Sequence, residues 1–252
     1  MGQNKHVRVA VILLVLLTLF ISLQSFLFCK HLYNETKIGY VDVVRQVETN
    51  PTEEIDISVL TKDKVNALRE KYHNNDIVGI LTIEGTGINE PILKYYNNDY
   101  YLNHNAYGDY QAEGSVYEDY RTNLTDKKVL IFGHSSPGWV VPFNELEKYY
   151  DKNFYDNHKY IEVTNESSIR TYEIFSVLIE TSDFTYMNLN ISDDTYNSYL
   201  RKYQDKSMYK TITKVNDGDE IIILQTCSNK AEYQNYNKKF LLVIAKKIRE
   251  VK

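Results

Sequence analysis

Short apolar segments separated by polar turns dominate the chain after residue 73, and this pattern predicts β-strands. Residues 77–83 read IVGILTI, and they are followed by 84–89 (EGTGIN), whose two glycines are typical of a turn. Residues 219–229 read DEIIILQTCSN, and their continuous apolar run predicts a buried strand. Further strands are expected at 90–94, 114–117, 129–132, 160–164, 170–180, 211–215 and 239–248.

Three segments carry their apolar residues at helical spacing instead. Residues 61–73 place Val65 and Leu68 on one face among charged residues. Residues 142–150 begin with proline, which favours the first turn of a helix, and have one apolar side made by Phe143, Leu146 and Tyr149 or Tyr150. Residues 192–206 begin Ser-Asp-Asp, an N-cap followed by acids in the first turn. Short strands with inserted helices predict a mainly β fold, an irregular β-barrel preceded by a helical layer.

The N-terminus predicts attachment to a membrane. Residues 9–28 carry no charge and are long enough to cross a hydrocarbon layer of about 30 Å as a helix. We interpret them as an uncleaved anchor; a cleaved signal peptide, the alternative, has a shorter apolar region and a small-residue cleavage site. Basic residues in the tail, 1–8, predict that it is cytoplasmic. Residues 29–50 are then an extracellular linker that begins the first helix, and 51–252 form one extracellular domain.

The composition is that of a globular protein and excludes several kinds of partner. The 252 residues are 43% hydrophobic and 25% charged, and the formal net charge is -5 with both signs interleaved. No basic surface for nucleic acid is expected, although the 23 tyrosines could stack on bases. Cysteines and histidines lack the spacing of a metal site, so we expect neither a metal nor a cofactor.

Cys227 ends the strand predicted in 219–229, where a thiol is placed for chemistry. A small buried core residue is the alternative, because free cysteine is often buried. The only other cysteine, Cys29, adjoins the predicted anchor, so we expect no disulfide even in an oxidising medium. Because an exposed thiol without a function would be oxidised, we favour a nucleophile.

A cysteine nucleophile needs a nearby base or cation and a group that stabilises the oxyanion. Among the six histidines, His134 directly follows the apolar strand predicted at 129–132 and Gly133. A glycine there lets the backbone turn sharply and present the next side chain. A purely structural histidine is the alternative, but we expect His134 to be the partner of Cys227.

The residues around these two candidates resemble the sortase family, and class B sortases in particular. Residues 223–227 (ILQTC) resemble the sortase nucleophile signature, a strand that ends Leu-x-Thr-Cys, and 132–134 (FGH) resemble its histidine site. The helix predicted at 192–206 falls where class B enzymes insert a long helix before the cysteine strand. The resemblance covers roughly residues 40 to 250. Further class B motifs are DYYLNH at 99–104, YG at 107–108, GS at 114–115 and DYR at 119–121.

This resemblance implies a closed β-barrel of about eight strands with N-terminal helices. It also implies a reaction at the surface of a Gram-positive bacterium. Sortases cut a sorting motif near the C-terminus of a secreted protein after its threonine, hold the acyl group as a thioester, and pass it to an amine of a peptidoglycan precursor. In class B the motif is usually Asn-Pro-x-Thr. By resemblance Cys227 is the nucleophile and His134 the acid and base. The expected substrate-binding residues are Thr226, Leu224, Ser115, Tyr117 and Ser228.

The chain departs from the family at one position. Sortases have an arginine at the start of the strand after the cysteine, whereas 236–242 read YNKKFLL and the only arginine beyond Cys227 is Arg249. At about 3.3 Å per residue Arg249 lies too far along the strand, so Lys239 is the best match and Lys238 the next. Lysine keeps the charge but loses arginine's planar fork. Two solvated lysines at a sheet edge are the alternative.

The missing arginine leaves more than one function open. An active class B sortase is the leading hypothesis. A second hypothesis is a peptide-binding protein that keeps the fold and is catalytically weak or inactive. A third is a cysteine peptidase that yields the acyl group to water.

Overall fold

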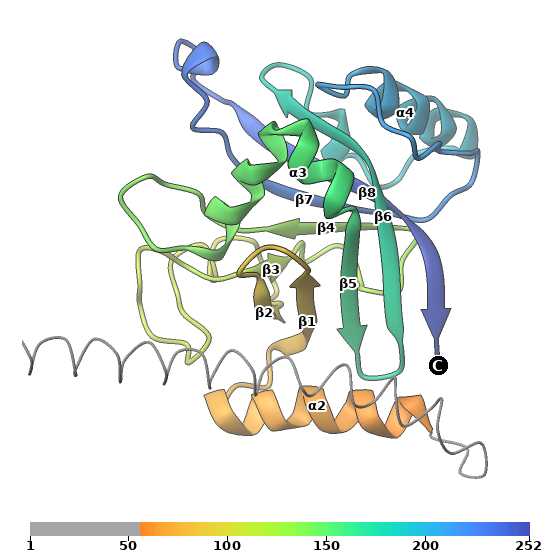
Figure 1. Ribbon diagram of the computed structural model, residues 1–252. Coiled ribbons are helices and arrows are strands. Elements are labelled where there is room, and N and C mark those ends of the chain that lie inside the picture. Colours follow the sequence, from red (N-terminus) through yellow and green to blue (C-terminus); the bar gives the residue numbers. More distant parts are fainter. Residues whose placement is uncertain (1–55) are drawn as a thin grey trace, which may run out of the picture. The chain divides into compact units, whose positions relative to one another are not determined.

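In the computed structural model, which describes residues 56–252, eight strands close into one barrel (Figure 1). Their order around the barrel is β1-β2-β3-β4-β7-β8-β6-β5, and β5 pairs with β1. The pairs β2–β3 and β4–β7 are parallel, and the others are antiparallel. The predicted closed barrel is therefore confirmed. The strands are β1 Ile77–Ile83, β2 Asn89–Leu93, β3 Tyr117–Glu118, β4 Lys128–Phe132, β5 Tyr160–Asn165, β6 Ile169–Glu180, β7 Ile221–Cys227 and β8 Phe240–Val251.

Helices are inserted between the strands as the sequence predicted. The helix α4 (Asp193–Asp205) lies between β6 and β7, and the Ser192 hydroxyl caps it by accepting from the Thr195 N–H at 3.3 Å. The helix α2 (Ile57–Tyr72) begins earlier than the predicted residue 61, because the carboxylate of Asp56 caps its first turn. The remaining helical segments are η1 Pro142–Tyr150, α3 Lys152–Asn157, η2 Thr185–Met187 and η3 Ala231–Tyr233.

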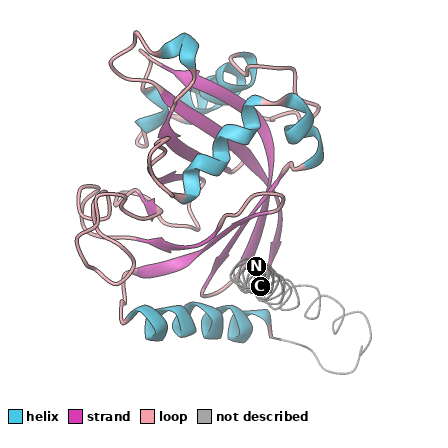
Figure 2. Cartoon of the chain, turned by 60° about the vertical axis from the view of Figure 1, so that its left-hand side comes forward, coloured by secondary structure: helices cyan, strands magenta, loops and turns pink. Residues whose placement is uncertain are grey.

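The helices occupy different ends of the barrel. Helix α2 lies across the end where β5 and β6 are joined, while η1, α3 and α4 lie toward the other end (Figure 1, Figure 2). Arg69 of α2 pairs with Glu166 in the turn between β5 and β6, and its Nε donates to the Ile77 carbonyl at 2.8 Å. The end of the barrel next to α2 is thus closed by a helix.

Alternating side chains on the strands build two apolar layers. Inward-facing residues such as Ile131 and Leu224 fill the barrel. Outward-facing residues such as Ile223 pack with Tyr196 and Leu200 of α4. All five residues of β4 are buried because both of its faces are covered. Each fully buried aliphatic side chain stabilises the fold by about 1.5–3 kcal/mol, so the buried side chains of β4 and β7 hold these two strands firmly in the barrel.

The prediction of a strand at 211–215 is wrong. Within residues 56–252 this segment joins no ladder, and side-chain contacts fix it instead. The Thr211 hydroxyl donates to the Phe175 carbonyl at 2.7 Å, and Gln204 Nε2 donates to the Thr213 carbonyl at 2.7 Å. Its alternation of buried threonines with exposed Ile212 and Lys214 therefore reflects a half-buried coil against β6 and α4.

The strand predicted at 114–117 is reduced to the two residues of β3. Gly114 has a φ of 59°, in the left-handed region that favours glycine, and a Cβ there would lie 2.5 Å from the Leu102 carbonyl oxygen. The Ser115 N–H donates to the Tyr101 carbonyl at 3.0 Å rather than to a strand. The segment therefore supports the backbone of Leu102, and ladder pairing begins only at Tyr117.

The helices within residues 56–252 are too short or too polar to cross a membrane. The predicted tail at 1–8, anchor at 9–28 and linker at 29–50 lie outside the described residues and stay predictions. So does residue 51 as the start of the domain.

Candidate active site

Two neighbouring parallel strands bring Cys227 and His134 to the same edge of the barrel. In the register of β4 and β7, Phe132 pairs with Gln225. The Gly133 N–H donates to the Gln225 carbonyl at 3.3 Å, and the Thr226 hydroxyl donates to the Gly133 carbonyl at 2.8 Å. Continuing the register places His134 opposite Cys227. Because parallel strands end at the same edge, two residues far apart in sequence become neighbours.

The Cys227 thiol is free and exposed at the end of β7. Nearby protein atoms still displace part of its water, and this burial raises the pKa of the thiol above its usual value. The positive charge of Lys239 acts in the opposite direction and lowers that pKa. Burial is the larger of the two effects, so the surroundings of the thiol favour its protonated form.

The His134 ring is oriented by its surroundings. Its Nε2 lies 2.8 Å from the Leu102 carbonyl oxygen, which can only accept, so Nε2 carries a proton and donates. Nδ1 is then the nitrogen that can take up or give back a proton. The Trp139 ring packs edge-on against the imidazole with centroids 5.6 Å apart. Within the described residues no hydrogen bond joins His134 to Cys227.

The glycine of the FGH motif has a steric role. A Cβ on Gly133 would lie 2.8 Å from Cδ2 of Phe143 in η1, which is too close for a side chain to be tolerated without a shift. Glycine thus lets η1 pack directly beneath the residue that precedes His134. Sequence reasoning assigned this glycine to a turn, whereas the close approach of Phe143 requires it.

Lys238 and Lys239 point to different neighbours. Phe240 pairs with Cys227, and the Ser228 N–H donates to the Lys239 carbonyl at 2.9 Å, so Lys239 lies next to the residue that pairs with Cys227. Its side chain is half-buried, and its Nζ donates weakly to the Tyr236 carbonyl at 3.4 Å. The Nζ of Lys238 lies 5.5 Å from the centroid of the Phe184 ring instead. Of the two, Lys239 has the position from which its charge acts on the thiol.

The residues predicted to bind substrate differ in accessibility. Leu224 is fully buried in the barrel, Thr226 and Ser228 are each 1% exposed, and Tyr117 is 7% exposed. Their roles in binding stay predictions. The half-buried Ser115 donates from its hydroxyl to the His104 carbonyl at 2.9 Å.

Sequence reasoning missed Tyr186. Its hydroxyl donates to Oε1 of Gln225, two residues before Cys227, at 2.8 Å. Burial raises the pKa of Tyr186 strongly, and the charges of Glu180 and Cys227 add to the effect. No motif marks this residue, because it lies in a short 3₁₀ segment far from the cysteine in sequence.

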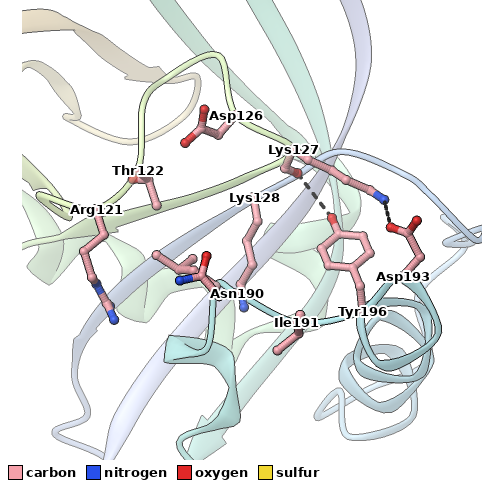
Figure 3. Close-up of a pocket in the computed structure, with 10 residues that line it drawn as sticks. Arg121, Thr122, Asp126, Lys127, Lys128, Asn190, Ile191, Asp193 and Tyr196 are labelled. Atoms are coloured by element: carbon pink, nitrogen blue, oxygen red, sulfur yellow. Dashed lines mark hydrogen bonds and ion pairs between the residues drawn. The ribbon is translucent and has the colours of Figure 1, made fainter.

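A pocket of about 240 Å³ lies at the other end of β4 and contains none of the predicted site residues (Figure 3). Arg121, Lys127 and Lys128 contribute its cations. Asn190 comes from the loop before α4 and Tyr196 from α4 itself. Lys127 and Asp193, which both line the pocket, form an ion pair at 3.1 Å. Within residues 56–252 no cluster of side chains has the make-up of a metal site.

Comparison with known proteins agrees with this geometry. Residues 81–248 match the family model described as the sortase domain. The chain is 35% identical over 199 residues to sortase B of Listeria monocytogenes, covering 77% of this chain and 79% of that protein. It is 30% identical over 179 residues to sortase B of Staphylococcus aureus, covering 70% and 72%.

A solved structure shows the same fold. The Staphylococcus aureus sortase B–substrate complex is 29% identical and superposes with a TM-score of 0.66, covering 75% of this chain and 86% of that one. The matched region spans both β4 and β7, the strands that carry His134 and Cys227. The chain therefore belongs to the sortase family, the cell-surface cysteine transpeptidases that sort proteins to the cell wall, and its relatives are class B sortases.

Proposed function

We propose that this sortase cleaves an Asn-Pro-x-Thr type motif after its threonine, with Cys227 as the nucleophile. It then transfers the protein to an amine of a peptidoglycan precursor. The observation that carries the proposal is the position of an exposed thiol and a half-buried imidazole at adjacent ends of two parallel strands. That arrangement is the one that covalent catalysis with proton transfer needs.

The proposed reaction has two steps that use the same groups. In the first, His134 takes the thiol proton, Cys227 Sγ bonds to the threonine carbonyl carbon, and the C–N bond breaks as His134 protonates the departing amine. In the second, the acceptor amine attacks the thioester and gives its proton to His134, and the thiolate leaves and takes that proton back from His134. The Leu102 carbonyl stabilises the imidazolium that forms between proton transfers, because it accepts from Nε2.

Lys239 is the proposed cation of the site. Its charge lowers the pKa of the Cys227 thiol, and the same charge would stabilise the oxyanion of each tetrahedral intermediate. Because an ammonium group lacks the planar fork of arginine, this contact is weaker than the family's usual one. The Ser228 N–H already donates to the Lys239 carbonyl, so it is not available to donate to the oxyanion. Stabilisation of the oxyanion therefore depends more on the Lys239 ammonium group.

The proposed substrates are secreted proteins with a C-terminal sorting signal, and the acceptor is the amine of a lipid-linked peptidoglycan precursor. The structural relative described as a sortase B–substrate complex supports binding of a substrate on this fold. Thr226, Leu224, Ser115, Tyr117 and Ser228 are the proposed substrate-binding residues. The apolar segment at 9–28 is the proposed single-pass anchor, with residues 1–8 in the cytoplasm and the catalytic domain outside.

The full-length protein offers a direct test with a library of sorting-motif peptides. We expect cleavage of Asn-Pro-x-Thr peptides, a transfer product when an amine is added, and no product from Cys227→Ala. A product that forms equally well without an amine would identify a peptidase that uses water. Absence of cleavage of every peptide would contradict the proposal.

One observation favours a second candidate, a peptide-binding protein with little or no catalysis. The segment at 236–242 has no arginine where the resemblance expects one, and Lys239 is only its proposed replacement. This candidate predicts peptide affinity that is equal in the wild type and in Cys227→Ala, with no turnover in either. Turnover that increases in Lys239→Arg would instead indicate a working but slowed enzyme.

A further inference from the structure

The 3₁₀ helix η1 (Pro142–Tyr150) presents a polar face to the two proposed catalytic strand ends. A 3₁₀ helix has three residues per turn, so every third side chain lies on the same face. One face, made of Phe143, Leu146 and Tyr149, is fully buried in the barrel core. The adjacent face contacts the residues that follow His134 and Cys227. It consists of Asn144, Glu147 and Tyr150.

Glu147 links the two strand ends through one carboxylate oxygen. The hydroxyl of Ser135, directly after His134, lies 3.2 Å from Glu147 Oε1 and 3.0 Å from Asn144 Oδ1, and its one proton is shared between these two acceptors of η1. The same Glu147 oxygen accepts from Nδ2 of Asn229 at 2.7 Å and from its backbone N–H at 3.3 Å, two residues after Cys227. Asn229 Nδ2 also donates to the Ser135 hydroxyl at 2.9 Å. A single side chain therefore joins both segments.

The turns of η1 on either side extend this contact. Asn144 Oδ1 accepts from the Ser136 N–H at 2.8 Å, and its Nδ2 donates to the Trp139 carbonyl at 2.7 Å. The Tyr150 hydroxyl lies 2.9 Å from the hydroxyl of Ser228. Asn144 thus holds the loop after His134, and Tyr150 holds the residue after Cys227.

The strands alone do not fix the two reactive side chains. Their ladder stops at Gly133 and Gln225, followed by the single contact from Thr226 to the Gly133 carbonyl. Beyond that point, the polar links between the two segments in the described part of the chain run through Asn229 and η1. Ser135 and Ser228 are 6% and 1% exposed, so these links are formed away from solvent, where hydrogen bonds are stronger.

We propose that Glu147 is a positioning residue that sets the separation and orientation of His134 and Cys227, with Asn144 and Tyr150 supporting it. The proposal rests on the catalytic roles proposed above for that pair. An error of about 1 Å between reacting groups can reduce a rate by about 100-fold, so an arrangement fixed from outside the strands affects turnover directly.

Glu147→Ala, Glu147→Gln and the control Glu145→Ala test the proposal in the full-length protein. Glu145 is on another face of the same helix, where it pairs with Lys148 and accepts from the Gly87 N–H at 3.1 Å. We expect Glu147→Ala to lower kcat for peptide transfer by about 100-fold with little change in KM. Glu147→Gln should recover much of the loss, because all three contacts use one oxygen that an amide also provides. Glu145→Ala should match the wild type.

Amide hydrogen exchange measures the same effect without requiring activity. Exchange across 134–136 and 227–230 should accelerate in Glu147→Ala, and in Asn229→Ala as a second variant, but not in Glu145→Ala. A kcat for Glu147→Ala within about twofold of the wild type, or the same kcat for the alanine and glutamine variants, would overturn the proposal. If the wild type itself turns over no sorting peptide, the proposed function fails. The positioning role is tested separately by hydrogen exchange, and unchanged exchange in both Glu147→Ala and Asn229→Ala would overturn it.

Discussion

The two ends of β4 hold their polar groups in opposite ways. At its start, Lys128 is 6% exposed, and its Nζ donates to the Asn188 carbonyl at 2.9 Å. Figure 3 shows its side chain beside Asn190, which belongs to the loop before α4. Just beyond the other end, His134 is half-buried and Cys227 on the neighbouring strand is exposed. A strand supplies chemical groups at both of its ends, and the elements that cover each end decide which groups can meet a substrate.

Different elements cover the two ends of β4, a loop at its start and the helix η1 beyond its other end. The loop before α4 lies over Lys128, and burial followed by the charge of Arg121 lowers the pKa of its ammonium group to about 8. At the open end, η1 contacts residues 135 and 228–229 and leaves the two reactive side chains accessible. Contact with neighbouring residues can therefore fix the proposed catalytic pair without burying it.

Removing the imidazole should produce the largest difference between the two ends. General acid–base catalysis contributes about 10²–10⁴-fold, so His134→Ala should lower kcat for peptide transfer by that order. Lys128→Met, at the covered end of the same strand, should leave kcat near that of the wild type. Steady-state transfer assays on both full-length variants provide the comparison, and equal losses would contradict it.

Lys238 and Lys239, adjacent in sequence at the open end, test whether a positioned cation is needed there. A well-placed oxyanion donor is worth about 2.7–4 kcal/mol, and an ammonium group makes a less specific contact, so Lys239→Ala should lower kcat by about 100-fold. Lys238→Ala is the matched control, because its Nζ lies against the Phe184 ring. Its kcat should stay near the wild-type value. A loss in Lys238→Ala as large as in Lys239→Ala would show that only the overall charge matters.

Much of the site could be predicted because strands end where their apolar runs end. The segments 129–132 and 219–229 placed His134 and Cys227 after two buried strands, and the FGH and LQTC signatures related them to one family. The parallel pairing of β4 with β7 then supplies the proximity that sequence spacing cannot. Local pattern was sufficient here because each strand is covered on both faces.

The polar face of η1 could not be predicted, because the type of helix decides it. Residues 142–150 were expected to be helical with Phe143 and Leu146 inside, and either Tyr149 or Tyr150 completed that face. A period of 3.0 buries Tyr149 and turns Tyr150 toward Ser228, whereas a period of 3.6 does not distinguish them. The partners of Glu147 are distant in sequence, so no local pattern marks them.

The covered end makes its own prediction about stability. The pKa of Lys128 falls from 10.5 to about 8 on folding, mainly through burial. Between pH 8 and 10.5 Lys128 binds a proton in the unfolded chain but not in the folded protein. This group therefore makes the free energy of unfolding rise with pH, by up to about 3 kcal/mol in all. Urea unfolding of the wild type and Lys128→Met from pH 8 to 10.5 should show curves that diverge accordingly. Parallel curves would contradict this description of Lys128.

The smallest expected effect concerns the thiol itself. The charge of Lys239 lowers the pKa of Cys227, so Lys239→Ala should shift the pH curve of alkylation by iodoacetamide to higher pH. Lys238→Ala should leave the curve in place. Rates measured on the full-length proteins across pH 7 to about 10 would detect the shift, and coincident curves for all three proteins would exclude an electrostatic role for Lys239.

Intact-mass measurement of the acyl-enzyme tests the central claim most directly. The full-length protein would be mixed with an Asn-Pro-x-Thr peptide without an amine, quenched in acid and digested to locate any adduct. We predict the mass of the peptide fragment that ends in threonine on the fragment containing Cys227, its loss when an amine is added, and no adduct in Cys227→Ala. A transfer product formed without any adduct on Cys227, or an adduct on another residue, would contradict the account.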